Sequence, residues 1–84
     1  MLPTPRLVIA ARILAGLSQN DLATEAGIGI ATLRRYERGD TNPRADKLNA
    51  ILGALRAHGV QFVEETDAVS EGIVRLKRPH RDDE

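Results

Sequence analysis

The architecture of this 84-residue chain follows from residues 18–39, SQNDLATEAGIGIATLRRYERG. Ser18 is followed three residues later by Asp21, which is the spacing of a capping box at a helix start. Gly27-Ile28-Gly29 then places one apolar residue between two helix-breaking glycines. We therefore expect two short helices, over 19–26 and 30–38, joined by a tight turn.

Longer helices are expected on either side of this segment. A helix over 5–15 is predicted because Thr4-Pro5 is typical of an N-cap followed by proline, and because Gly16 ends the pattern. A helix over 45–58 is predicted because apolar residues recur there at helical spacing and Gly59 follows them. The helical part of the chain is therefore expected to contain four helices.

The hydrophobic period changes after Gly59. Two β-branched runs, 60–64 and 73–76, predict an antiparallel hairpin. An isolated hairpin is marginal in water, so this one must pack on its own helices or on a second chain, and both alternatives stay open. We predict a mainly α fold with a helical domain over 1–59, a hairpin extension over 60–77 used for packing or dimerisation, and a disordered tail over 78–84.

Composition limits the function classes. The chain has no cysteine, and His58 and His80 are too few for a zinc site, so no metal or cofactor is expected. His58 is expected to interact with the dipole of the last helix. Without a long apolar run or a signal-like N-terminus, the chain is predicted to be cytoplasmic, with no membrane association. It shows no nucleophile–base pair or phosphate-binding loop, so we do not expect an enzyme.

The net charge of zero conceals an asymmetry. Residues 1–58 carry eight basic and five acidic side chains, for +3, whereas residues 59–84 carry four basic and seven acidic ones, for −3. Arginines cluster between positions 34 and 44, and such a cluster favours binding to a polyanion. An ordinary solvated surface is the alternative explanation.

The predicted helix over 30–38 has two chemically different faces. The inner half holds Thr32, Leu33, Tyr36 and Glu37. The outer half holds Ala31, Arg34, Arg35 and Arg38, with Ile30 at its edge. Because the guanidinium group matches guanine or a phosphate, this outer face is suited to a DNA groove, although a solvated helix face is the alternative. Two short helices joined by a glycine turn also match the helix-turn-helix signature.

Two charged residues are predicted to lie inside the helical domain. Arg12 falls in an otherwise apolar stripe of the first helix, and Glu37 falls on the inner half of the third. A buried unpaired charge costs several kcal/mol, so we predict that Arg12 and Glu37 form an ion pair between these helices. In the alternative, Arg12 extends to water and Glu37 lies at the edge of the core.

Several motifs occur together at regular intervals in the chain. They are Ile9-Ala10-Ala11-Arg12, Gly16-Leu17-Ser18-Gln19-Asn20-Asp21-Leu22-Ala23, Ala26-Gly27-Ile28, Ala31-Thr32-Leu33-Arg34-Arg35-Tyr36-Glu37-Arg38-Gly39 and Pro43. Together they resemble the XRE family, the helix-turn-helix domains related to phage lambda and 434 repressors and Cro. The resemblance covers about residues 6–58, and the segments 59–63 and 72–76 resemble a small bacterial subgroup with a short C-terminal β extension.

The resemblance implies a fold, a function and site residues. It implies a lambda-repressor-like four-helix DNA-binding domain and a transcriptional regulator, usually a repressor that acts as a homodimer, and the family commonly has the Arg12–Glu37 pair. By position, the residues implied to contact bases are Ile30, Ala31 and Arg35, with Arg34 beside them. Those implied to contact the DNA backbone are Gln19, Arg38, Thr41, Asn42 and Arg44.

Two departures from the family pattern affect these expectations. Gly29 stands where serine or threonine commonly caps the third helix, so that cap is weaker. Ile30 and Ala31 stand where some members have glutamine or arginine. Because apolar side chains favour thymine methyl groups and arginine favours guanine, we expect a half-site with a T-rich step beside a G.

The expected partner is double-stranded DNA, bound in the major groove. A homodimer with recognition helices about 34–36 Å apart would match a pseudo-palindromic site. Two other functions stay open. The chain could be the antitoxin of a toxin–antitoxin pair, with the β extension and acidic tail covering a partner protein, or a protein-interaction adaptor that keeps the fold without binding DNA.

Overall fold

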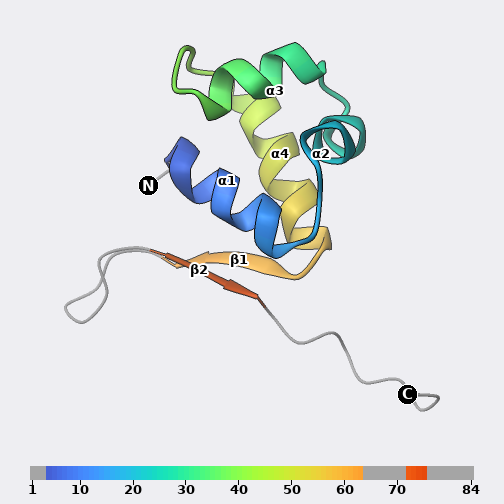
Figure 1. Ribbon diagram of the computed structural model, residues 1–84, viewed down its shortest axis with the longest axis vertical. Helices are drawn as coiled ribbons and strands as arrows, with labels where there is room; N and C mark the ends of the chain where they lie inside the picture. The colour runs from blue at the N-terminus through green and yellow to red at the C-terminus, as the bar shows by residue number, and fades with distance from the viewer. Residues whose placement is uncertain (1–3, 64–71, 76–84) are drawn as a thin grey trace.

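The computed structural model describes residues 4–63 and 72–75, and of the latter segment only the backbone. The loop between the two predicted strands and the predicted disordered tail lie outside the described residues. The elements in chain order are α1 (Pro5–Leu14), α2 (Gln19–Ala26), α3 (Ile30–Glu37), α4 (Ala45–Ala57), β1 (Val60–Val63) and β2 (Gly72–Arg75) (Figure 1). The mainly α fold with four helices is thereby confirmed.

α1 begins as its sequence predicts. The Thr4 hydroxyl accepts a hydrogen bond from the Leu7 N–H at 3.3 Å, and proline occupies the first helical position. The helix ends at Leu14, one residue before the predicted end, and the chain then passes through Gly16 at φ 78°. A positive φ of this size favours glycine, so the prediction of the stop from Gly16 has a direct backbone cause.

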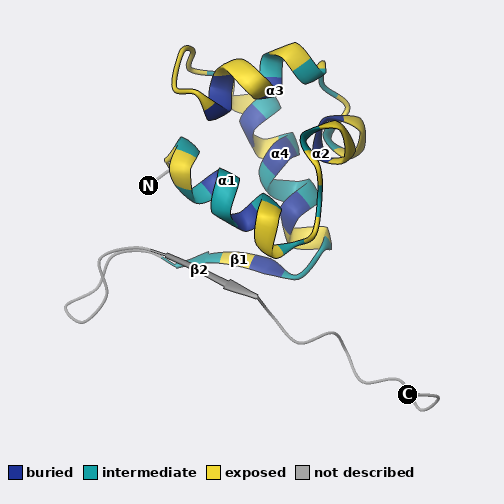
Figure 2. Ribbon diagram, in the orientation of Figure 1, coloured by how far each residue is buried: buried dark blue, intermediate teal, exposed yellow. Residues whose placement is uncertain are grey.

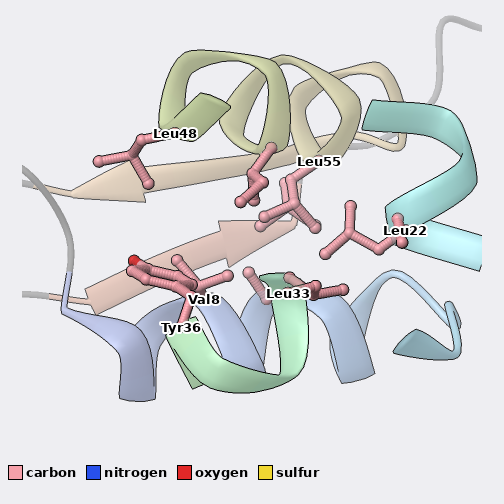
Figure 3. Close-up of a cluster of buried hydrophobic side chains, with 10 residues drawn as sticks. Val8, Leu22, Leu33, Tyr36, Leu48 and Leu55 are labelled. Carbon is pink, nitrogen blue, oxygen red and sulfur yellow. The ribbon is translucent and has the colours of Figure 1, made fainter. Parts of the chain in front are cut away.

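The core is shared by all four helices and the first strand. Its buried apolar residues are Val8, Ala11, Leu22, Ala23, Leu33, Tyr36, Leu48, Ile51, Leu55 and Val60. In Figure 3 these side chains meet between the helices and the hairpin, and in Figure 2 the buried segments face the interior of the bundle. Each fully buried leucine or isoleucine contributes about 1.5–3 kcal/mol relative to an exposed one, so this cluster fixes how α3 lies against the other helices.

The hairpin packs on the helices of its own chain. β1 pairs with β2 antiparallel, with Val60 opposite Arg75 and Val63 opposite Gly72. β1 ends one residue before the predicted limit of 64, and β2 begins and ends one residue before the predicted range of 73–76. Differences of this size are common at element boundaries. Val60 is fully buried in the core, β1 contacts α4, and β2 lies along α1 (Figure 1). Of the two predicted arrangements, packing within the chain is the one that the described residues show.

The C-terminal end of α1 carries the large apolar side chains that stay exposed in the described part of the chain. Ile13 is 64% exposed and Leu14 is 37% exposed, although α3, α4 and β2 all contact this helix. The apolar surface of α1 is thus only partly covered. None of the described helices combines the length and apolar character that a membrane span requires.

Candidate nucleic-acid interface

The turn between α2 and α3 sets the angle between these two helices. α2 begins with a complete capping box: Ser18 accepts from the Asp21 N–H, and the Asp21 carboxylate accepts from the Ser18 N–H. These hydrogen bonds hold the pKa of Asp21 below its ordinary value. At the other end Gly27 adopts φ 70° and the Ile28 N–H bonds back to the Ala23 carbonyl at 3.0 Å. This left-handed cap reverses the chain within a few residues.

α3 separates into the two faces predicted from its sequence. Leu33, Tyr36 and Glu37 are buried and Thr32 is half-buried, whereas the outer residues are exposed (Figure 2). Those exposed outer residues are Ala31, Arg34 and Arg35, together with Arg38 at the C-cap of α3. Gly29 provides no side-chain cap, as its residue type predicts. The outer face of α3 therefore presents arginine side chains to solvent on a helix whose inner face is anchored in the core.

Ile30 differs from the other residues expected to contact bases. Its side chain is half-buried and packs against the core cluster. Ala31 beside it is exposed. The structure therefore leaves only part of Ile30 accessible, and the apolar contact surface at the start of α3 is smaller than two exposed side chains would provide.

The two charged residues predicted to pair between α1 and α3 lie in direct contact. Arg12 Nε donates to Glu37 Oε2 at 2.9 Å and Arg12 Nη2 donates to Glu37 Oε1 at 3.3 Å. Arg12 Nη1 donates to the Leu17 carbonyl at 2.9 Å. The side chains are only 14% and 4% exposed, so this two-point contact fixes the C-terminal end of α3 on α1.

Gln19 joins this pair and extends it to the surface. Gln19 Nε2 donates to Glu37 Oε1 at 2.9 Å, and Arg34 Nε donates to Gln19 Oε1 at 3.4 Å. The sequence interpretation missed both contacts. A signal was available, because a buried carboxylate can accept more hydrogen bonds than the bidentate contact of one guanidinium provides, and Gln19 opens the helix that precedes α3.

The basic residues after α3 contact nearby acids. Arg38 Nε lies 2.9 Å from Asp40 Oδ2, and Arg44 Nε lies 3.7 Å from Asp46 Oδ1. Both pairs are well exposed, as are Thr41 and Asn42 between them. Figure 1 shows this loop at one end of α3 and α2 at the other. The residues expected to contact the DNA backbone thus lie toward the C-terminal end of α3, where Gln19 bonds to Glu37 and residues 38–44 follow the helix.

A further polar contact joins α2 to the end of α4. His58 Nε2 lies 2.9 Å from both carboxylate oxygens of Glu25. His58 is also the C-cap residue of α4, the position from which an interaction with the helix dipole was expected. The sequence did not predict the partner, which is 33 residues away along the chain. Within the described residues, no cluster of three or more potential metal ligands forms.

Comparison with known families identifies the class of this protein. A family model described as helix-turn-helix matches residues 8–60, which is more than half of the chain. This match, together with the glycine turn between α2 and α3 and the exposed arginines of α3, identifies the protein as a DNA-binding helix-turn-helix regulator. The chain belongs to the XRE type of this family. The match ends at Val60, so it covers almost none of the hairpin, and no curated protein matches the chain.

Proposed function

We propose that this protein is a sequence-specific transcriptional repressor that binds the major groove of double-stranded DNA as a homodimer. The observation that carries the proposal is the exposed arginine face of α3, whose inner face is anchored by the buried Arg12–Glu37 pair. A rigid helix with an exposed guanidinium row offers the donor geometry that guanine edges and phosphates accept. A location in the cytoplasm, where such a repressor would meet DNA, is part of this proposal.

The proposed base contacts come from the first turns of α3. They are made by Ile30, Ala31, Arg34 and Arg35. The exposed positions of Arg34 and Arg35 and the partly exposed Ile30 support this assignment. Arginine would contact guanine, and the small apolar surface of Ile30 and Ala31 would contact a thymine methyl group.

The proposed backbone contacts lie toward the C-terminal end of α3, at the start of α2 and in the loop that follows α3. They are made by Gln19, Arg38, Thr41, Asn42 and Arg44. Gln19 is the first residue of α2, where backbone N–H groups without helical partners attract a phosphate. Exposure of the loop residues supports their assignment, and phosphate can replace the exposed acids that Arg38 and Arg44 now contact.

Homodimerisation follows from the size of the domain. One such domain makes few base contacts, and specific affinity in the nanomolar range needs more. The exposed apolar end of α1 beside the hairpin supports this region as the surface between two copies. We keep the division into a helical domain over 1–59 and an extension over 60–77, with the extension fixed to the core by Val60.

Selection from a random pool of DNA duplexes tests the proposal. We expect enrichment of a pseudo-palindrome with half-sites about 34–36 Å apart and a G beside a T-rich step. Arg35→Ala should weaken binding to the selected site by about 1–3 kcal/mol and relax the preference at one position. Arg44→Ala should weaken all duplexes alike and reduce the salt slope by about 1.

Arg56→Ala is the matched control, because Arg56 is an exposed arginine on α4. It removes the same charge and should leave the selected sequence unchanged. If wild-type protein binds no duplex in a salt-dependent way, the repressor proposal fails and the adaptor on the same fold becomes the better interpretation. If it binds duplex without any base preference under α3, the base contacts fail while DNA binding stands.

A further inference from the structure

A continuous row of hydrogen bonds runs from the buried ion pair to the outer face of α3. Arg12 donates to Glu37, Gln19 Nε2 donates to Glu37 Oε1 at 2.9 Å, and Arg34 Nε donates to Gln19 Oε1 at 3.4 Å. Glu37 is buried, the Arg12 side chain is 14% exposed, Gln19 is half-buried and Arg34 is exposed. Gln19 is thus the one residue in the row that touches both the buried pair and a proposed base contact.

The chemistry of its neighbours fixes which way the Gln19 carboxamide points. Its NH2 group faces a carboxylate, which only accepts hydrogen bonds, and its oxygen faces a guanidinium, which only donates them. Rotating the amide by half a turn would place oxygen against oxygen and nitrogen against nitrogen, and both contacts would become repulsive. The Glu37 carboxylate therefore determines that an acceptor, not a donor, is presented to Arg34.

We propose that Gln19 is a positioning residue that orients the Arg34 guanidinium through the buried Arg12–Glu37 pair. This inference rests on the proposed function, because the oriented guanidinium acts on DNA. It is distinct from the proposed contact of Gln19 with a phosphate, which the backbone N–H at the start of α2 can make without the carboxamide.

The benefit of such positioning is entropic. A free arginine side chain loses rotamer entropy when it is fixed in a complex. A hydrogen bond to Nε restrains the side chain before binding and leaves the terminal nitrogens of the guanidinium to donate to DNA. Arg35 is an internal comparison, because within the described residues it makes no side-chain hydrogen bond or ion pair.

A double-mutant cycle on DNA binding tests this role. Gln19→Met removes both hydrogen bonds but keeps the length of the side chain and a good helix former. With the selected duplex, we expect Gln19→Met to weaken binding about fivefold, the value of one net hydrogen bond of about 1 kcal/mol. In the Arg34→Ala background the same substitution should have less than about a twofold effect, whereas in the Arg35→Ala background the full loss should persist.

Equal losses in the wild-type and Arg34→Ala backgrounds would overturn the proposal, because Gln19 would then act on the DNA by itself. Absence of any loss would overturn it as well. Asn49→Met, at an exposed amide side chain on α4, is the matched control and should not change binding. Gln19→Ala serves as a second variant, and urea unfolding of each protein shows whether both remain folded.

A measurement without DNA separates this inference from the proposed function. In NMR spectra of the free protein, the Arg34 Nε–H should exchange with water more slowly than the Arg35 Nε–H, and Gln19→Met should abolish the difference. Failure of wild-type protein to bind any duplex would defeat the proposed function and leave this exchange result to decide the positioning. Equal exchange at Arg34 and Arg35 in wild-type protein would defeat the positioning itself.

Discussion

Two arginine–carboxylate pairs near the C-terminal end of α3 have the same Nε–O distance and different physical roles. Arg12–Glu37 and Arg38–Asp40 both show an Nε–O distance of 2.9 Å. The side chains of the first pair are 14% and 4% exposed, and those of the second are 64% and 55% exposed. Burial decides the outcome, because water screens the second pair and leaves its arginine available to a phosphate, whereas the first pair fixes the helix.

The largest expected effect comes from removing one member of the buried pair. Glu37→Met leaves the Arg12 guanidinium buried without its carboxylate, and we expect the free energy of unfolding to fall by about 3–5 kcal/mol in urea denaturation. Replacing both residues, Arg12→Met with Glu37→Met, should recover most of that loss, because no buried charge is left unpaired. A loss below about 1 kcal/mol for Glu37→Met would mean that the pair behaves like a surface pair.

The buried side of the comparison contains a second polar group. The Tyr36 hydroxyl is buried and has no hydrogen-bond partner within the described residues. Since an unsatisfied buried hydroxyl is unfavourable, Tyr36→Phe should raise the free energy of unfolding by about 1 kcal/mol. Destabilisation by Tyr36→Phe of more than about 1 kcal/mol would show that the hydroxyl has a partner after all.

The same hydroxyl makes the free energy of unfolding depend on pH in a direction that can be stated. Burial, and secondarily the charge of Glu37, raises the pKa of Tyr36 above its ordinary value of 10.0. The folded chain then holds the phenolic proton more tightly than the unfolded chain does. The free energy of unfolding should therefore decrease as the pH rises above about 10. Tyr36 is the only tyrosine and the chain has no tryptophan, so phenolate absorbance follows this group alone.

The smallest expected effect on stability comes from the exposed pair. Asp40→Asn should change the free energy of unfolding by less than about 1 kcal/mol. Arg38 would then contact a phosphate without first breaking its ion pair with Asp40. We therefore expect the affinity for duplex of arbitrary sequence to rise by up to about fivefold. The slope of the logarithm of the binding constant against the logarithm of the salt concentration should become steeper by up to about 0.9. Glu25→Gln, which removes one negative charge on α2, is the control for net charge alone. Equal gains from both variants would assign the effect to net charge rather than to the pair.

The sequence predicts those features whose causes are local. Ser18 with Asp21 and Thr4 with Pro5 place two helix starts, and Gly27 places the turn, because each acts within one helical turn of itself. The Arg12–Glu37 pair was predictable for another reason: two charges on apolar faces leave few arrangements that avoid an unpaired buried charge.

Contacts between distant elements were beyond local rules. The hydrogen bonds of Gln19 and the His58–Glu25 contact depend on how the helices lie together, and neither follows from hydrophobic spacing. The strand pattern of the hairpin shows that an apolar face must be covered, and cannot show that α1 and α4 of the same chain cover it. Ile30 was placed correctly at the edge of α3, but its share in the core depends on neighbouring helices.

The central claim is that the outer face of α3 binds duplex DNA while its inner face stays fixed in the core. Titrating the selected duplex into isotopically labelled protein and following backbone amide NMR signals tests this directly. We expect the largest shifts at the start of α2, along the outer residues of α3 and over residues 38–44, with those of Leu48, Ile51 and Leu55 in the core nearly unchanged. Shifts confined to α1 and the hairpin, with α3 unaffected, would contradict the account.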